Sequence, residues 1–213
     1  MRDNKLGDAN AEEFDDRDYP FIMSNLLDDL KDFALAQARH NPSKDKQTFW
    51  EAIACKADIL GDKFRDASGW GGGYNLNPTI IAESKELFTI EEYGFNLRFF
   101  KHEKDAVLNN LRRAKKLNLP ADLTLTQWLT TLIHYRFLCA YCEIKQYNHL
   151  EHFIPLNSLD KRSGTTYKNC VPACATCNYK KGKEHPANIL PGFRNEYEPV
   201  KAYLSGISDS DLL

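Results

Sequence analysis

Two pairs of cysteines constrain the fold of this chain more than any other feature of its sequence. The pairs, Cys139 with Cys142 and Cys174 with Cys177, both have the spacing C-x2-C, and 31 residues (143–173) separate them. A C-x2-C pair forms a tight turn whose two sulfurs point at one tetrahedral centre. The pairs therefore predict one structural Zn²⁺ ion bound by four thiolates. The separation exceeds the usual spacing of about 15–20 residues, so an insert is expected between the two knuckles.

The rest of the composition favours metal binding over disulfide bonds. The chain has 213 residues and six cysteines, and it contains no run of about 18 apolar residues, so no membrane span is expected. Residues 1–18 are polar and acidic, which does not fit a secretion signal. We therefore expect the cytoplasm, where thiols stay reduced. Cys170, outside both pairs, is interpreted as a structural residue, and the alternative for the four paired cysteines is a set of buried thiols without metal.

The net charge of −2 conceals an uneven distribution. Residues 1–32 contain ten acidic and four basic residues, a net charge of −6, so the other 181 residues carry −2 − (−6) = +4. One basic run extends from Arg112 to Lys116. The other lies between residues 161 and 183, contains no acid, and consists of Lys161, Arg162, Lys168, Lys180, Lys181 and Lys183. One such run is usually a solvated face, but two runs that flank a cysteine–histidine cluster favour a polyanionic partner.

Hydrophobic periodicity predicts a helical N-terminal half. Residues 1–18 are expected to be an acidic flexible tail, followed by a helical region of unknown role at residues 19–100. The expected elements of that region are two amphipathic helices at 21–40 and 46–64, a glycine-rich linker at 67–78, and a short helix followed by a strand at 95–100. In the second helix we expect Phe49 on the apolar face and Cys55 in a core or half-buried position.

Two further helices are expected before the first cysteine pair. Residues 102–119 have apolar residues at helical spacing up to Pro120, and residues 124–137 open with Thr124 and Gln127 at the spacing of a capping box. This helix also carries His134, which has no acid or cysteine at ligand spacing and is interpreted as a core or surface residue.

The insert between the cysteine pairs contains the chemically informative residues. Glu151 and His152 precede an apolar pair and a proline in the segment "EHFIP", which predicts a strand that ends at Pro155. A basic turn follows, then a second strand near 169–172, and then a short helix that we expect to open at Asn178, directly after Cys177.

This order of motifs resembles the HNH (His-Asn-His) endonuclease family over residues 124–186. The resemblance rests on "EHFIP", on the asparagine of "KNCVPAC", on "CNYKKG", and on the two bracketing C-x2-C pairs of the zinc-knuckle subtype. It implies a zinc-stapled ββα-metal (HNH) nuclease core, which together with the mostly helical N-terminal half predicted from periodicity gives an α+β chain. The nuclease domain would then span residues 101–190, and residues 191–213 would be a C-terminal extension.

The resemblance also implies roles for individual residues. His152 would be the general base, and Asn169 would brace the loop of the catalytic site. Glu151 and Asn178 would offer oxygen ligands to a catalytic Mg²⁺ or Mn²⁺ ion. Asn178 has the alternative role of a plain helix cap. His149 is interpreted as a surface or substrate contact, and His185, beyond the helix, as a terminal charge or phosphate contact.

The function implied is a metal-dependent endonuclease that hydrolyses DNA phosphodiester bonds, with RNA left open as a substrate. The alternative is a zinc-ribbon module that binds nucleic acid without cleaving it, although such a module has no need of Glu151, His152 and Asn178 together. The six basic residues at 161–183 would contact the phosphate backbone. Phage, restriction and anti-phage defence settings all agree with the pattern. The N-terminal helical half is expected to bind a protein partner or a second copy of the chain.

Overall fold

The computed structural model describes residues 19–68, 77–90, 95–158, 160–184 and 194–207. The chain divides into two compact units, Met1–Leu87 and Phe88–Leu213, which are described separately. The predicted acidic tail, most of the predicted glycine-rich linker and His185 lie outside the described residues. Within the described part, no helix is both long and apolar enough to cross a membrane.

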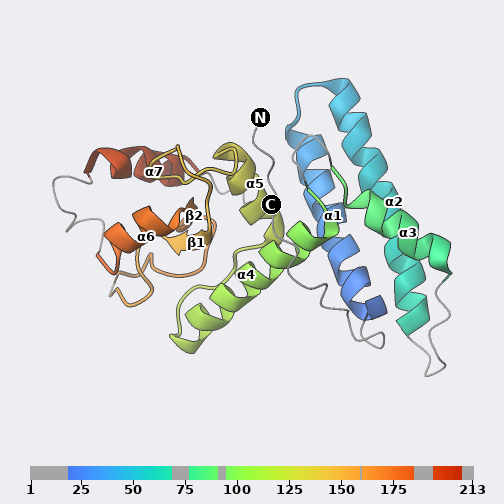
Figure 1. Cartoon of the computed structure of the whole chain (residues 1–213), viewed down its shortest axis with the longest axis horizontal. Helices are drawn as coiled ribbons and strands as arrows, with labels where there is room; N and C mark the ends of the chain where they lie inside the picture. The colour runs from blue at the N-terminus through green and yellow to red at the C-terminus, as the bar shows by residue number, and fades with distance from the viewer. Residues whose placement is uncertain (1–18, 69–76, 91–94, 159, 185–193, 208–213) are drawn as a thin grey trace. The chain divides into compact units, whose positions relative to one another are not determined.

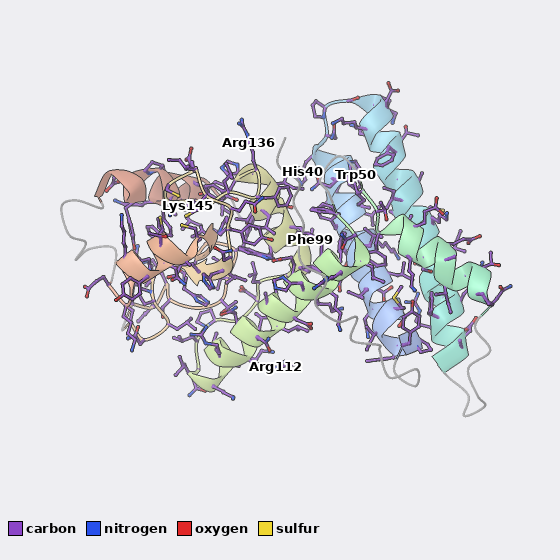
Figure 2. All side chains as sticks on the ribbon, viewed as in Figure 1. His40, Trp50, Phe99, Arg112, Arg136 and Lys145 are labelled. Atoms are coloured by element: carbon purple, nitrogen blue, oxygen red, sulfur yellow. The ribbon has the colours of Figure 1, made fainter. Side chains whose placement is uncertain are left out.

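The described residues of the first unit form three helices, α1 (Tyr19–His40), α2 (Lys44–Ser68) and α3 (Pro78–Leu87) (Figure 1). Trp50 of α2 is fully buried and packs edge-to-face on Phe33 of α1, with 5.5 Å between the ring centroids (Figure 2). The prediction that Phe49 and Cys55 face the core was wrong, because both are exposed. Successive helical residues are rotated by about 100°, so burial of Trp50 turns Phe49 toward the rim.

Two helices precede the sheet in the second unit, and each begins at a capped N-terminus. Helix α4 (Leu97–Lys116) starts where we had expected a strand, because the side chain of Asn96 accepts a hydrogen bond from the backbone N–H of Phe99 and caps the helix. Helix α5 (Leu125–His134) opens with the predicted capping box, in which Thr124 and Gln127 exchange side-chain and backbone hydrogen bonds.

A buried carboxylate joins these helices to the chain that enters the sheet. Glu103 of α4 is 2% exposed and accepts hydrogen bonds from Trp128 Nε1 at 2.7 Å and from the Tyr147 hydroxyl at 2.8 Å. The His102 ring also lies 2.9 Å from Glu103, and this bond raises the pKa of His102. A buried charge with several hydrogen-bond donors is costly to disturb, so Glu103 fixes α4 relative to the segment before the first strand.

The sheet has two antiparallel strands, β1 (His149–His152) and β2 (Cys170–Ala173), with His152 opposite Cys170. Helix α6 (Ala175–Lys181) follows β2 directly and packs on β1 (Figure 1). The N-cap of α6 is Cys174, so the prediction that the helix opens at Asn178 was wrong. Helix α7 (Arg194–Gly206) packs on the residue after β1, because the Tyr197 hydroxyl donates a hydrogen bond to the Phe153 carbonyl. The α+β fold class predicted from the sequence is confirmed.

Candidate active site and metal centre

The four paired cysteines form one cluster. The Sγ atoms of Cys139, Cys142, Cys174 and Cys177 all lie within 4.8 Å of one another. Zn–S bonds of about 2.3 Å in a tetrahedron place sulfurs about 3.8 Å apart, so the cluster has the dimensions of a four-thiolate site. The four cysteines are therefore positioned to bind one metal ion, and they join the turn before β1 to the start of α6.

The backbone favours the thiolate form of Cys142, whereas burial raises the pKa values of Cys139 and Cys177 in the protein without metal. Burial raises the pKa of Cys142, but the backbone N–H groups of Lys145 and Ile144 lower it to about 7. The backbone N–H of Cys177 lies 3.4 Å from the Cys174 sulfur in the first turn of α6. N–H groups that point at sulfur stabilise negative charge there, as expected for a knuckle whose sulfurs are ligands.

His152 lies at the end of β1 and is 6% exposed. Its Nε2 atom is 2.9 Å from the hydroxyl oxygen of Thr165, which is itself 3.0 Å from the backbone carbonyl of Asn110 in α4. A threonine hydroxyl has one hydrogen, and a carbonyl can only accept, so that hydrogen points to Asn110. Nε2 must then donate its own hydrogen to Thr165, which leaves the lone pair of His152 on Nδ1.

Thr165 is held in this position by the backbone on either side of it. Gly164 has a φ of +146°, and a Cβ atom there would approach the carbonyl oxygen of Pro120 to 2.6 Å. The N–H of Thr165 donates to the same Pro120 carbonyl, and the Thr165 carbonyl accepts from Leu123. The turn thus needs glycine at 164, and it presents the Thr165 hydroxyl to His152.

The His152 side chain is neutral at physiological pH. Burial is the largest cause that lowers the pKa of His152, followed by the positive charges of Arg113 and Lys181, and the pKa falls to about 3. A neutral ring with its lone pair on Nδ1 is the form in which histidine acts as a base, but a pKa this low also makes His152 a weak base in the free protein.

Glu151 is bonded to a lysine that we had expected at the surface. Its Oε1 atom accepts a hydrogen bond from Lys181 Nζ at 2.7 Å, and the Lys181 side chain is 0% exposed. The structure therefore does not place Lys181 among surface lysines that could follow a phosphate backbone, because its ammonium group is buried against a carboxylate. Burial raises the pKa of Glu151, and Lys181 opposes this shift.

A groove of about 570 Å³ brings the candidate catalytic residues together. Regular strands direct successive side chains to opposite faces, yet Glu151 and His152 both line this groove, at the point where β1 ends and the chain bends. Asn178 lines it as well, from the middle of α6, and is half-buried. His149, interpreted from sequence as a surface or substrate contact, is exposed and also lines the groove.

Sequence reasoning missed the contribution of α4 to this groove. His102, Asn110 and Arg113 of α4 also line the groove, and Arg113 Nη1 donates to Asn110 Oδ1 at 3.0 Å. Arg113 belongs to the basic run 112–116, which was the available signal, and Arg112 of the same run is labelled on α4 in Figure 2. The sequence alone does not show which residue of that run faces the groove, because this depends on how α4 packs on β1.

Asn169 is buried and braces the loop after β1. Its side-chain oxygen accepts from the backbone N–H of Ile154 at 2.7 Å, and its amide nitrogen donates to the carbonyls of Ile154 and Gly164. The amide therefore joins the segment after His152 to the turn that carries Thr165. The role in the catalytic site that the resemblance implies for Asn169 stays a prediction.

The remaining basic residues do not form one surface. Lys183 lines the same groove as Glu151, and Lys180 is exposed on α6. Three others, Lys161, Arg162 and Lys168, line a different groove of about 790 Å³ together with Phe153, Tyr197 and residues of α7. Arg162 is also bonded to Asp160 at 2.6 Å.

Two antiparallel strands, a following helix and a four-cysteine cluster at their junction define a zinc-knuckle type of ββα-metal core. Comparison with protein families matches residues 139–184 to the HNH endonuclease family. The match lies within residues 124–186, so the resemblance to this family is confirmed for that segment. Neither the curated proteins nor the solved structures contain a match to the chain.

Proposed function

We propose that this protein is a metal-dependent endonuclease that hydrolyses phosphodiester bonds in DNA. The observation that carries the proposal is the groove in which Glu151, His152 and Asn178 meet beside the cysteine cluster. A protein that only reads nucleic acid needs a shaped, basic surface. It does not need a neutral, hydrogen-bonded histidine next to a carboxylate and an amide.

In this proposal His152 removes a proton from the attacking water. The hydroxyl of Thr165 holds the Nε2–H group, and Nδ1 receives the proton. The low pKa of His152 keeps the ring neutral before the reaction. A positioned general base of this kind is worth about 10²–10⁴-fold in rate.

Glu151 and Asn178 would hold the catalytic divalent ion, Mg²⁺ or Mn²⁺. A carboxylate and an amide form an oxygen donor set, which suits these hard cations, and Glu151 Oε1 is already bonded to Lys181. When bound, the ion would stabilise the charge that develops on the phosphate and the leaving oxygen. Zn²⁺ at the four cysteines would have a structural role and would hold α6, with Asn178, against β1.

Arg113 and Lys183 would bind the phosphates of the substrate, because both are cationic, exposed and line the groove. Phosphate contacts of this kind position a nucleic acid without reading its sequence. Arg113 comes from α4, outside the segment matched to the HNH family.

A plasmid-nicking assay tests the proposal. The wild-type protein should nick supercoiled DNA with Mg²⁺ or Mn²⁺ and not with EDTA. His152→Ala should lose about 10²–10⁴-fold in rate, whereas the matched variant His149→Ala, which changes a neighbouring histidine of the same strand, should lose much less. Binding of DNA without any nicking under all metal conditions would refute the nuclease and favour the zinc-ribbon reader.

A further inference from the structure

The ion pair between Glu151 and Lys181 changes the charge of the groove. The Lys181 ammonium lies 2.7 Å from Glu151 Oε1, and both side chains are shielded from solvent, with exposures of 0% for Lys181 and 14% for Glu151. Charges separated from water are weakly screened, so the lysine neutralises most of the field of this carboxylate. Lys181 is bonded to Oε1 of Glu151, so only the other carboxylate oxygen is not bonded to this lysine.

No other carboxylate among the described residues that line the groove compensates for this loss. Glu151 is the one acidic residue in that lining, whereas Arg113 and Lys183 add two positive charges. Glu103 is next to His102 in α4 but does not line the groove, and it is buried where Trp128 and Tyr147 donate to it. The groove of the free protein is therefore cationic, which attracts a phosphate and repels a divalent cation.

We infer that Lys181 makes binding of the divalent ion conditional on the phosphate of a nucleic-acid substrate. The inference rests on the proposed function, in which Glu151 and Asn178 hold that ion. A phosphate bound by Arg113 and Lys183 brings the negative charge that the free groove lacks. With the phosphate present, Glu151 and Asn178 would hold the ion with an affinity that the protein alone does not provide. Lys181 is a positioning residue here, because its buried ammonium touches Glu151 and does not reach the substrate.

Thermodynamic linkage makes the inference quantitative. If DNA strengthens ion binding by a given factor, the ion must strengthen DNA binding by the same factor. We expect a factor of about ten or more, within the range of about 5–150-fold that is usual for coupled sites. The Lys181→Met variant removes one positive charge next to Glu151. It should therefore bind the ion more tightly in the absence of DNA and show a smaller gain when DNA is added.

The experiment measures Mn²⁺ binding by electron paramagnetic resonance on zinc-loaded full-length protein. All proteins carry His152→Ala, so that the DNA is not cleaved, and a short duplex is added or omitted. Duplex alone corrects for Mn²⁺ bound by DNA, and Glu151→Gln identifies the signal that belongs to the site. Lys181→Arg keeps the positive charge and should retain the coupling, whereas Lys181→Met should lose most of it.

The inference would be overturned if the free protein and the DNA complex bound Mn²⁺ at Glu151 with the same affinity. The positive charge of the groove would then not weaken ion binding. Equal Mn²⁺ affinities of Lys181→Met and Lys181→Arg in the absence of DNA would also overturn it. The comparison of free and DNA-bound protein with native Lys181 decides the matter even if Lys181→Met does not fold. Failure of the proposed function would give a different result. The wild-type protein would then not nick DNA, and this outcome does not depend on the Mn²⁺ titration.

Discussion

The hydrogen bond from His152 to Thr165 allows a sharp test of how the proposed general base is held. Thr165→Val keeps the shape of the side chain and removes the hydroxyl between His152 Nε2 and the Asn110 carbonyl. The carbonyl lies inside α4 and is expected to retain a helical partner. The His152 N–H loses its acceptor in a buried position, which costs about 1–3 kcal/mol. For a unit of this size we expect a melting temperature lower by about 4 °C or more.

The same substitution should slow cleavage less than loss of the base itself. With valine at 165 the His152 ring remains in place, but its protonated nitrogen and its orientation are no longer set by a partner. We expect the rate of nicking at saturating Mg²⁺ to fall by about 10- to 100-fold. This is at or below the lower end of the rate loss expected when a general base is removed. Nitrogen NMR of histidine-labelled protein, with His152→Ala used for assignment, should show Nε2–H in the wild type and a mixture of tautomers in the variant.

Thr165→Ser is the matched control, because serine keeps the hydroxyl and loses only a methyl group. It should retain the Nε2–H tautomer and a rate within about threefold of the wild type, with a modest loss of stability. If Thr165→Val keeps both the wild-type rate and the wild-type tautomer, the hydroxyl does not orient His152. Equal damage by serine and valine would show that Thr165 acts through packing.

Three further predictions follow from the site. Glu151→Ala and Asn178→Ala should regain much of their activity at raised Mg²⁺ or with Mn²⁺, because mass action offsets a lost ligand. His152→Ala should not regain activity in this way. If a titration of the nicking rate against metal rescued His152→Ala and not Glu151→Ala, the assigned roles would be exchanged. Cys174→Ser should contain less zinc by elemental analysis and should unfold β2 and α6, and a fully folded, zinc-free wild type would contradict this. A fragment of residues 88–213 should nick mixed-sequence DNA, whereas a fragment that starts at residue 101 should be unstable because it lacks the first turn of α4; a folded but inactive 88–213 fragment would mean that residues 1–87 complete the site.

The sequence by itself determined the features that depend on local spacing. The C-x2-C pairs predicted the cysteine cluster, because each knuckle is a short turn whose geometry follows from its own residues. The order of "EHFIP", an asparagine and a second knuckle predicted the HNH domain. The capping box at Thr124 and Gln127 could likewise be predicted from the sequence, since its hydrogen bonds join residues three positions apart.

Tertiary structure decided which of the charged and polar residues meet. Lys181 looked like its neighbours in a basic run, but packing of α6 on β1 buries it against Glu151, a partner 30 positions away. In the same way, packing of α4 on β1 places Arg113 in the groove and the Asn110 carbonyl beside Thr165. Hydrophobic periodicity shows that a helix has a buried face. It does not show which distant element covers that face, because burial depends on contacts between residues far apart in the chain.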